Sequence, residues 1–449
     1  MFKKILIANR GEIAVRIIRA CRELGISTIA VVSEADKDCL HALIADETVC
    51  IGPAPSGESY LNMQNIISAA LTHGAEAIHP GFGFLSESAD FADICRRCGI
   101  EFIGPDAQSI RLLGDKSAAK ATAKANGVPT IPGSDGEIET FKEVCAVAER
   151  TGYPLLIKAS AGGGGRGIRL VEAPEELENA YNAAKAEAEA CFGYGGVYIE
   201  KYLTNTRHVE FQIMADSFGN VVHLGERDCS MQRRKQKVLE ESPCTALTPE
   251  LREEMGQTAI KAAKAVNYKN TGTVEFLLDS NGNYYFMEMN TRIQVEHPVT
   301  EMVTRLDLVK EQIRIAAGEK LSFTQQDAAL CGYAIECRIN AESPANNFAP
   351  RSGTIAALHI PGGNNIRFDS QLYEGYKIPV NYDSMLGKLI VWGRSREEAI
   401  AKMKSALNEM IIDGVETNVD FQLYLLDNKD FRSGNYHTGT IERILSVER

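Results

Sequence analysis

Apolar runs alternate with helical periodicity through the first hundred residues of the chain. The short apolar runs that predict strands cover residues 5–8, 28–32, 77–78 and 102–103. Residues 11 to about 24 carry apolar side chains at the spacing of an amphipathic helix. Strands that alternate with helices predict βαβ units and a parallel sheet. The turn Asn9-Arg10-Gly11-Glu12 lacks the G-x-G-x-x-G pattern of a dinucleotide-binding unit, so dinucleotide binding is disfavoured.

Two further regions follow this alternating segment. Strands at 155–158 and 197–200 flank a glycine run, and strands rich in charged residues continue to about Gly318. From Cys331 more strands lead to a helix, Arg396 to Ile411, that we expect to close the chain. We predict a mixed α/β and α+β fold with three domains. Their ranges are 1–113, 114–330 and 331–449.

The composition is that of a soluble globular protein, with 44% apolar and 24% charged residues. The 449 residues exceed one ordinary domain of about 100–200 residues. The net charge of -12 and the pI near 5.3 argue against nucleic acid or a membrane surface as a partner, because both are polyanions. Any phosphate site must therefore be locally basic.

The cysteines and the apolar runs indicate the compartment. Eleven scattered cysteines, without a disulfide-like spacing, predict a reducing, cytoplasmic environment. The CxxC of Cys95 and Cys98 falls late in a helical pattern, which favours two surface thiols over a metal or redox site. Cys229 precedes the basic run 233–237, so we expect it to be the most readily alkylated thiol. The first apolar run ends at Asn9, and none approaches the roughly 20 residues that span a bilayer.

A glycine-rich loop follows the apolar strand that ends at Lys158. Its run Gly162–Gly165 frees backbone amides to approach an anion closely, which makes the loop a candidate phosphate cradle. It is not a Walker A loop, because no Gly-Lys-Ser/Thr follows it into a helix. A glycine run alone is also typical of a flexible linker. The lysine on the preceding strand favours the phosphate site.

A β-hairpin is predicted around Asn281-Gly282, the favoured two-residue turn. A turn centred there sets Glu275 directly opposite Glu288, and alternation adds Asn290 and Arg292 to the same face. The other face is filled by Val274, Phe276, Met287 and Met289. Opposed like charges are destabilising, so two carboxylates and an amide oxygen suit Mg²⁺. The alternative is a solvated strand face with salt bridges.

Polar and basic side chains gather after the hairpin and in a second run. They are residues 292–298 and the cluster Arg227, Arg233, Arg234, Lys235 and Lys237. Charge runs are usually solvated faces. In an acidic chain, an anionic substrate offers another reason for local positive potential.

Five strings, taken together and in order, resemble the biotin carboxylase family of the ATP-grasp superfamily. They are 7–14, 79–87, the glycine loop, 226–234 and 288–298. The likeness runs nearly end to end. It implies an ATP-grasp fold with an N-terminal Rossmann-like domain and a C-terminal mixed α/β domain. It also implies that the second domain includes a mobile glycine-rich lid at about 131–203. It also implies an enzyme that spends ATP, with Mg²⁺ or Mn²⁺, to join bicarbonate to biotin on a carrier protein.

The resemblance implies roles for the matching positions. ATP would contact Lys116, Lys158, Gly164, Gly165, Glu200, Lys201, Tyr202, Leu203, His208, Gln232 and Lys235. The metal would bind Glu275, Glu288 and Asn290, in agreement with the hairpin. Bicarbonate would contact Lys237, Arg292, Gln294 and Val295. Glu296 would be the general base, and Arg338 would face the ureido oxygen of biotin, with Lys237 and Arg292 as further catalytic groups.

The implied chemistry passes through carboxyphosphate, whose breakdown gives CO₂ and a phosphate that deprotonates biotin N1′. A guanidinium at the ureido oxygen stabilises the developing charge. From the residues alone, Arg338 also fits an ordinary strand salt bridge beside Glu336. Three positions depart from the family pattern: Lys235 stands for a common His, Phe82 for Tyr and Arg351 for Ser.

The carrier is expected to be a separate protein. Ala401-Lys402-Met403-Lys404 only superficially resembles a biotinylation motif, because it lies in a helical pattern. A biotin carboxyl carrier protein and carboxyltransferase subunits are thus implied partners, and a homodimer is expected from the family. The final acceptor stays open, with acetyl-CoA ahead of pyruvate. Two rival functions are a carbamoyl-phosphate-type synthetase and a non-catalytic nucleotide-binding regulator.

Overall fold

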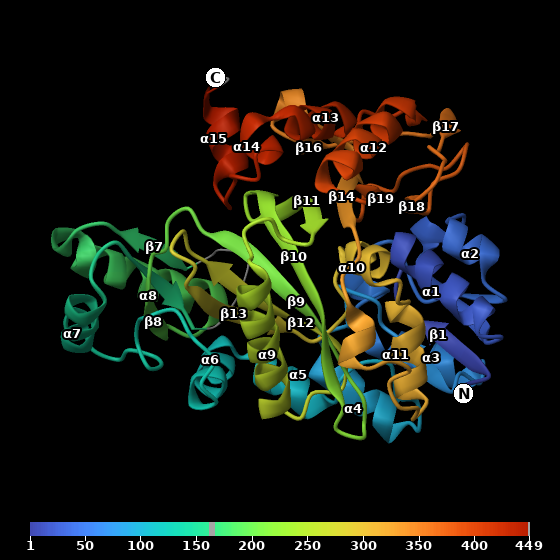
Figure 1. Ribbon diagram of the computed structural model, residues 1–449. Coiled ribbons are helices and arrows are strands. Elements are labelled where there is room, and N and C mark those ends of the chain that lie inside the picture. Colours follow the sequence, from blue (N-terminus) through green and yellow to red (C-terminus); the bar gives the residue numbers. More distant parts are fainter. Residues whose placement is uncertain (161–166, 448–449) are drawn as a thin grey trace.

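The computed structural model describes residues 1–160 and 167–447. Figure 1 shows an N-terminal region at one side, a long central sheet, a small sheet with its helices at the other side, and a helical layer over the top. Strands alternate with helices in the first region, and the central region combines runs of antiparallel strands with helices. This arrangement confirms the predicted mixed α/β fold.

The N-terminal region contains a parallel sheet of five strands in the order β3-β2-β1-β4-β5. Its strands are β1 (Lys4–Ile7), β2 (Ser27–Val32), β3 (Glu47–Cys50), β4 (Ala77–His79) and β5 (Glu101–Phe102). Its helices are α1 (Gly11–Glu23), α2 (Leu40–Ile44), α3 (Met63–Thr72), α4 (Ala89–Arg97) and α5 (Ala107–Gly114). Helices α3, α4 and α5 begin where Asn62, Ser88 and Asp106 accept a hydrogen bond from the third helical N–H.

A side chain takes the place that glycines have in a dinucleotide-binding turn. Asn9 follows β1 and donates from Nδ2 to the carbonyls of Pro80 and Phe82, at 2.6 and 2.7 Å. A Cβ on Gly81 would lie 2.9 Å from that Nδ2, so glycine is required there. The loop that follows β4 is therefore held against the end of β1.

The central sheet has eight strands in the order β13-β12-β9-β10-β11-β14-β19-β18. They are β9 (Arg207–Ala215), β10 (Val221–Arg233), β11 (Gln236–Ser242), β12 (Asn270–Leu278), β13 (Tyr284–Asn290), β14 (Tyr333–Asn340), β18 (Ile366–Ser370) and β19 (Met385–Gly393). Neighbouring strands are antiparallel. Strands from before and after residue 331 thus share one sheet. The helices beside it are α6 (Lys116–Ala125), α9 (Pro249–Ala265), α10 (His297–Thr304) and α11 (Leu308–Ala316).

A small antiparallel sheet, β7-β6-β8, lies beyond the end of the central sheet. Its elements are β6 (Leu155–Ala159), β7 (Ile168–Val171), β8 (Val197–Lys201), α7 (Phe141–Thr151) and α8 (Leu177–Phe192). The glycine run, with Gly164 and Gly165, lies outside the described residues. The predicted role of that loop therefore stays a prediction.

The helix expected to close the chain is α12 (Arg396–Glu409), but three more helices follow it. They are α13 (Val419–Asp427), α14 (Lys429–Arg432) and α15 (Thr440–Val447). Short strands β15 (Glu342–Ser343), β16 (Ala349–Pro350), β17 (Ala357–His359) and β20 (Ile411–Asp413) complete this region. Met403 is fully buried on α12, so the run 401–404 belongs to a packed helix and does not form an exposed turn.

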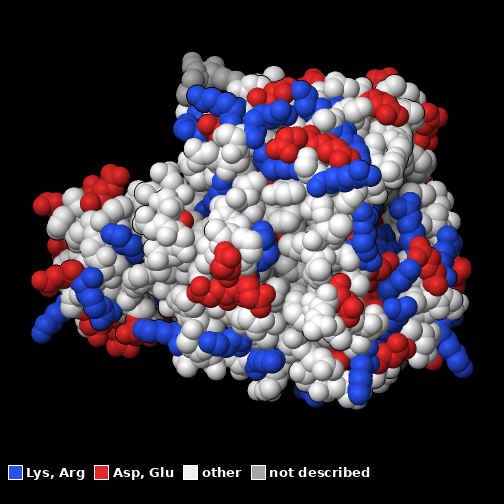
Figure 2. All heavy atoms as spheres, viewed as in Figure 1, with Lys and Arg blue, Asp and Glu red and all other residues white. Residues whose placement is uncertain are grey.

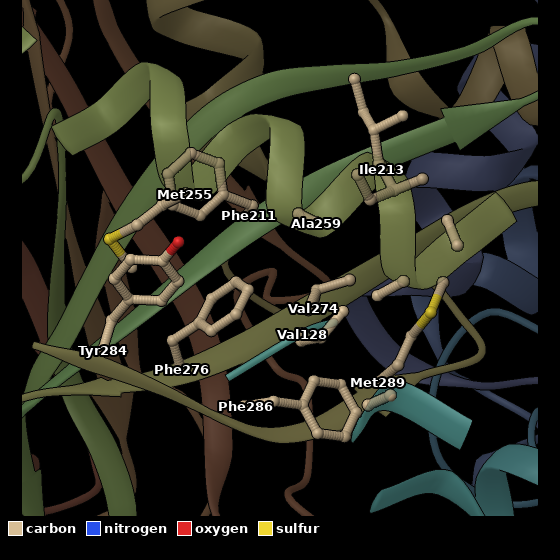
Figure 3. Packing of buried hydrophobic residues seen from close by; sticks show 14 of the residues in the cluster. Val128, Phe211, Ile213, Met255, Ala259, Val274, Phe276, Tyr284, Phe286 and Met289 are labelled. Atoms are coloured by element: carbon tan, nitrogen blue, oxygen red, sulfur yellow. The ribbon is translucent and has the colours of Figure 1, made fainter. Parts of the chain in front are cut away.

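One face of the β12–β13 hairpin packs against α9 (Figure 3). Phe276 makes edge-to-face contacts with Phe211 and Tyr284, at ring distances of 6.1 and 5.6 Å. Burying an aromatic or aliphatic side chain of this size contributes about 1.5–3 kcal/mol. This core fixes which face of the hairpin points away from α9.

The hairpin pairs Glu275 with Glu288 as expected, but not through the expected turn. Leu278 pairs with Tyr284, so five residues form the loop, and Asp279 accepts from two backbone amides within it. A bulge between Glu275 and Phe276 shifts the register back by one residue. Met287 lies at that bulge and is 36% exposed, so its predicted place in the apolar core is wrong.

The surface and the thiols bear on the predicted environment. No helix in residues 1–160 and 167–447 is long and apolar enough to cross a bilayer. Basic and acidic side chains are interspersed over the face seen in Figure 2. All eleven cysteines are free. Cys95 is buried and Cys98 is exposed, so the prediction of two surface thiols holds for one of them.

Candidate active site

A cavity of about 1940 Å³ opens where the central sheet, the small sheet and the N-terminal region meet. The predicted site residues that line it are Lys116, Lys158, Glu200, Lys201, Tyr202, Leu203, His208, Gln232, Lys235, Lys237, Glu275, Glu288, Asn290, Arg292, Gln294, Val295 and Arg338. Glu296 is fully buried behind this lining. The structure thus gathers positions that are up to 222 residues apart in the sequence (Lys116 to Arg338).

Three lysines from three elements converge on the outer part of the cavity. Lys116 begins α6, Lys158 lies on β6, and Lys235 lies in the turn between β10 and β11 with a φ of 66°. Partial burial, with repulsion from Lys158 and Lys116, lowers the pKa of Lys235. Such mutual repulsion favours an anion between them. This is the arrangement expected for a polyphosphate.

Glu200 of β8 holds two lysines, one from the small sheet and one from α6. Its carboxylate lies 2.5 Å from Lys158 Nζ and 2.9 Å from Lys120 Nζ. Burial would raise the pKa of Glu200, but these two cations lower it overall. Its neighbour Lys201 donates to the carbonyl of Tyr153 at 2.8 Å. One buried carboxylate therefore fixes two ammonium groups at the cavity wall.

The predicted metal ligands share the cavity face of the hairpin. Glu275 Oε1 accepts from Asn290 Nδ2 and Gln294 Nε2, at 2.8 and 2.9 Å. His208 Nε2 lies 2.9 Å from Glu275 Oε2. Burial would raise the pKa of Glu275, but Lys237 and His208 lower it well below its usual value. Glu288 is partly exposed, 3.4 Å from Lys116 Nζ. Oxygen donors thus face the cavity from both strands.

A buried charge cluster forms the inner end of the cavity. Lys237 Nζ lies 2.5 Å from Glu296 Oε1, 2.6 Å from Glu210 Oε2 and 3.4 Å from Glu275 Oε1. Burial alone would raise the pKa of Glu296, but Lys237 and Arg338 hold it well below its usual value. Glu296 is therefore a carboxylate at neutral pH. It can accept a proton when Lys237 and Arg338 bind a substrate anion in its place.

Two arginines flank this cluster. Arg338 donates to Glu240 of β11 and to Glu296, at 2.6 and 2.9 Å, so it does form a strand salt bridge, and its predicted role at biotin stays a prediction. Arg292 donates from Nε to Glu87 at 2.9 Å, and from its other two nitrogens to Gln294 and Asn290. Both guanidiniums are held by several partners and line the cavity. A substrate that binds them therefore loses little free energy to the ordering of these side chains.

Two expectations about single residues are wrong. Cys229 is fully buried, and burial together with Glu210 raises the pKa of its thiol far above its usual value. It is not the reactive thiol, because the adjacent charges in the sequence do not offset burial. The basic cluster also disperses: Arg227 is fully buried and bound to Glu210, whereas Arg234 lies at the surface and donates to Asn347.

Several residues of the site were not predicted. Three of them are acids: Glu210 accepts from Lys237, Glu87 from Arg292, and Glu240 from Arg338. The fourth is Lys388, which donates to the Val295 carbonyl. Glu210 on β9 lies directly opposite Glu275 on β12, and Lys388 on β19 lies directly opposite Arg338 on β14. For Glu210, Glu240 and Lys388 the signal in the sequence is a charged residue within a strand, whereas Glu87 lies in the loop between β4 and α4. The strand order decides which partner each of these residues meets, and the strand order cannot be read from the sequence.

The chain matches three family models in order. They are described as "Biotin carboxylase, N-terminal domain" over residues 1–110, "Carbamoyl-phosphate synthase L chain, ATP binding domain" over 115–324, and "Biotin carboxylase C-terminal domain" over 336–443. The central model alone fits both a biotin carboxylase and a carbamoyl-phosphate-type synthetase. The two flanking models, which together cover most of the remaining chain, favour a biotin carboxylase.

Known proteins resemble the chain over its full length. A biotin carboxylase of Nostoc sp. is 58% identical over 443 residues, 99% of each chain. A Campylobacter jejuni biotin carboxylase, solved as a β-γ-ATP complex, is 50% identical with a TM-score of 0.95 and 99% coverage of both chains. The biotin carboxylase domain of Hydrogenobacter thermophilus 2-oxoglutarate carboxylase, solved as a dimer with MgADP, ADP and bicarbonate, is 51% identical with a TM-score of 0.93, covering 100% of this chain and 98% of that one. The chain belongs to the biotin carboxylase family.

Proposed function

We propose that the chain carboxylates biotin on a separate carrier protein, with ATP and bicarbonate as co-substrates. The observation that carries this proposal is the Glu296 carboxylate held between Lys237 and Arg338 at the inner end of a lysine-lined cavity. A base between two cations suits an anionic substrate that must lose a proton. The solved relatives with ATP, MgADP and bicarbonate support the same substrates.

The outer cavity binds the nucleotide in this proposal. Lys116, Lys158 and Lys235 neutralise phosphate charge, and Glu200 keeps Lys158 in place. The remaining proposed ATP contacts are Lys201, Tyr202, Leu203, His208, Gln232 and the glycine loop with Gly164 and Gly165. Lys235 replaces a common His, so its ammonium group brings one more charge to this wall.

Glu275, Glu288 and Asn290 fit a hard divalent cation, because they present oxygen donors on one face of a hairpin toward the cavity. Mg²⁺ or Mn²⁺, when bound, supplies a Lewis acid that neutralises charge on the phosphate oxygens. The like-charge pair of Glu275 and Glu288 is relieved at the same time. His208 and Lys237 already offset part of that charge around Glu275.

Bicarbonate occupies the inner end, where Lys237, Arg292, Gln294 and the Val295 backbone contact it. Its hydroxyl proton passes to a Glu296 carboxylate oxygen, and the freed oxygen attacks the γ-phosphorus while the bond to ADP breaks. The Lys237 and Arg292 charges stabilise the carboxyphosphate that forms. Their fixed geometry, set by Glu210 and Glu87, keeps the reacting groups close.

Biotin then reacts beside Arg338. Carboxyphosphate splits into CO₂ and phosphate, the phosphate takes the N1′ proton, and N1′ forms a bond to CO₂. The ureido nitrogen gains nucleophilicity as negative charge grows on the ureido oxygen, which Arg338 stabilises. One such donor is worth about 3–4 kcal/mol in enzymes that stabilise an oxyanion.

The partners follow from what the reaction needs. A biotin carboxyl carrier protein and carboxyltransferase subunits are proposed, because Met403 of the motif-like run is buried in α12. The H. thermophilus relative is a dimer, which supports a homodimer here. The free thiols and the helices of the described chain are compatible with the cytoplasm.

We propose acetyl-CoA as the final acceptor, in an acetyl-CoA carboxylase that supplies fatty acid synthesis, with pyruvate or another acyl-CoA next. The biotinylated protein that co-purifies distinguishes these acceptors.

The test measures bicarbonate-dependent ADP release and carboxybiotin in one assay, with free biotin or with ammonia. Biotin is expected to stimulate ADP release and to become carboxylated. Stimulation by ammonia alone assigns the chain to carbamoyl-phosphate chemistry. Absence of turnover under every condition assigns it to a non-catalytic regulator.

A further inference from the structure

Two carboxylates from different elements hold the Arg338 guanidinium. Glu240 of β11 accepts from Nε at 2.6 Å, and Glu296, just before α10, accepts from an Nη at 2.9 Å. Both carboxylates are fully buried, while the Arg338 side chain is 17% exposed and lines the cavity. The two acids thus grip the guanidinium from its protein side.

The two contacts differ in how long they last during the reaction. Glu296 is the proposed proton acceptor for bicarbonate, and a protonated carboxyl binds a guanidinium much less strongly than a carboxylate does. Glu240 does not line the cavity and has no contact with the Lys237 ammonium among its hydrogen bonds in the described chain. When biotin has to be engaged, Glu240 is the charged contact that remains.

The neighbour of Glu240 explains how it keeps its charge. Glu336 lies directly opposite on β14 and is also fully buried, and neither of its oxygens has a hydrogen-bond partner among the described residues. Burial raises the pKa of Glu336 well above its usual value, and it raises the pKa of Glu240 to about 7 although Arg338 opposes the effect at both carboxyls. Two opposed buried carboxylates cannot both be ionised without a large cost, and only Glu240 of the pair accepts a hydrogen bond from a cation, so the single negative charge of the pair is favoured on Glu240.

We infer that Glu240 is a positioning residue for the biotin half-reaction: it anchors Arg338 after Glu296 has taken the bicarbonate proton. The inference rests on the proposed function and deepens it. Glu240 acts through Arg338 and touches neither substrate. The Glu296 contact serves the earlier, bicarbonate-dependent step, so the two acids divide the grip on one guanidinium between the two half-reactions.

The test compares Glu240→Gln with Glu336→Gln in the full chain. Both substitutions are isosteric, equally buried and on the same sheet face, but only the first removes a hydrogen-bonded carboxylate from Arg338. ADP and carboxybiotin are measured in parallel with free biotin. For Glu240→Gln, the ratio of carboxybiotin to ADP is expected to fall about tenfold or more, on the scale of weakening one oxyanion donor. The KM for bicarbonate is expected to change less than about threefold, because Lys237 and Arg292 are untouched.

The control and the second variant make the outcome decisive. Glu336→Gln is expected to keep the parental product ratio. Glu240→Asp, which keeps the charge on a shorter side chain, is expected to give an intermediate ratio, and it replaces Glu240→Gln if that variant does not fold. A parental ratio in a folded Glu240 variant overturns the inference, as does an equal fall in both glutamine variants. A parent chain that makes neither product contradicts the proposed function instead, so the two failures are distinguishable.

Discussion

Lys388 donates from Nζ to the carbonyl oxygen of Val295 at 2.7 Å. The ammonium group is fully buried and also lies 3.1 Å from Glu12 Oε1 on α1. Val295 lies in the segment proposed to contact bicarbonate through its backbone. The N-terminal helix α1 thus supports the proposed bicarbonate-binding segment through one buried lysine, which no pattern in the sequence singles out.

Lys388→Met is expected to raise the KM for bicarbonate more than the KM for ATP, because it frees the Val295 peptide and leaves the nucleotide wall intact. It also leaves Glu12 buried without its cation, which costs about 3–5 kcal/mol of unfolding free energy. The double variant Lys388→Met/Glu12→Gln is expected to recover stability but not the KM for bicarbonate. Urea unfolding and initial rates test the two effects separately. Recovery of both by the double variant reduces Lys388 to a purely structural role.

Glu288→Gln is expected to weaken Mg²⁺-dependent turnover far more than folding. It removes one of two opposed carboxylates, so the magnesium concentration for half-maximal rate rises. Without metal, relief of that repulsion offsets the lost Lys116 contact, and the unfolding free energy changes by less than about 1 kcal/mol. Glu253→Gln on the exposed side of α9 is the matched control. Unchanged turnover and magnesium dependence in Glu288→Gln excludes the hairpin as the metal site.

The hairpin also shows what the sequence predicts and what it does not. Alternation and a turn signal placed Glu275 opposite Glu288, and this pairing is confirmed. The turn itself is longer, and a bulge at Met287 compensates, so the correct register has a different cause. Turn length and bulges depend on packing against α9, which acts over long sequence separations.

Residues that act through neighbours were beyond the sequence. Glu240 meets Arg338, and Glu210 meets Lys237, only because β11 pairs with β14 and β9 lies between β10 and β12. Local charge patterns do not give strand order. The wrong expectation for Cys229 has a related origin, since charges adjacent in sequence favour a thiolate only where water reaches it.

His41 on α2 is expected to make the protein less stable in mild acid. It is fully buried, and burial lowers its pKa to about 4, with Asp36 opposing and Arg10 adding to the effect. Its folded pKa lies below the unfolded value, so its contribution is complete above about pH 6.5 and is lost as the pH falls toward 4. A difference of this size corresponds to roughly 3 kcal/mol.

His41→Gln is therefore expected to flatten the dependence of unfolding free energy on pH between about 6.5 and 4. Urea unfolding at several pH values measures the slope for both proteins. His79, which is also buried with a lowered pKa, is retained in both and contributes equally. Identical slopes in the variant and the parent would assign the acid sensitivity to other groups.

Arg338→Gln and Glu296→Gln are expected to fail in different ways, because the proposed function places Arg338 at biotin and Glu296 at bicarbonate. Glu296→Gln cannot accept the bicarbonate proton, so carboxyphosphate does not form and both ADP release and carboxybiotin are lost. Arg338→Gln keeps the base and Lys237, so bicarbonate-dependent ADP release continues and the carboxyphosphate is lost to water. Carboxybiotin formation falls by roughly a factor of 100 or more, on the scale of one oxyanion donor.

Parallel measurement of the two products, with ADP binding as the control for an intact nucleotide site, makes the comparison quantitative. Arg338 lies 2.9 Å from Glu296, so a modest change in ADP release is expected as that carboxylate loses one of its two cations. The division of roles requires the carboxybiotin loss to exceed the ADP loss by at least about tenfold. Equal loss of both products in a folded Arg338→Gln protein would place this arginine in the ATP half-reaction, because biotin capture would then no longer be the step that depends on it.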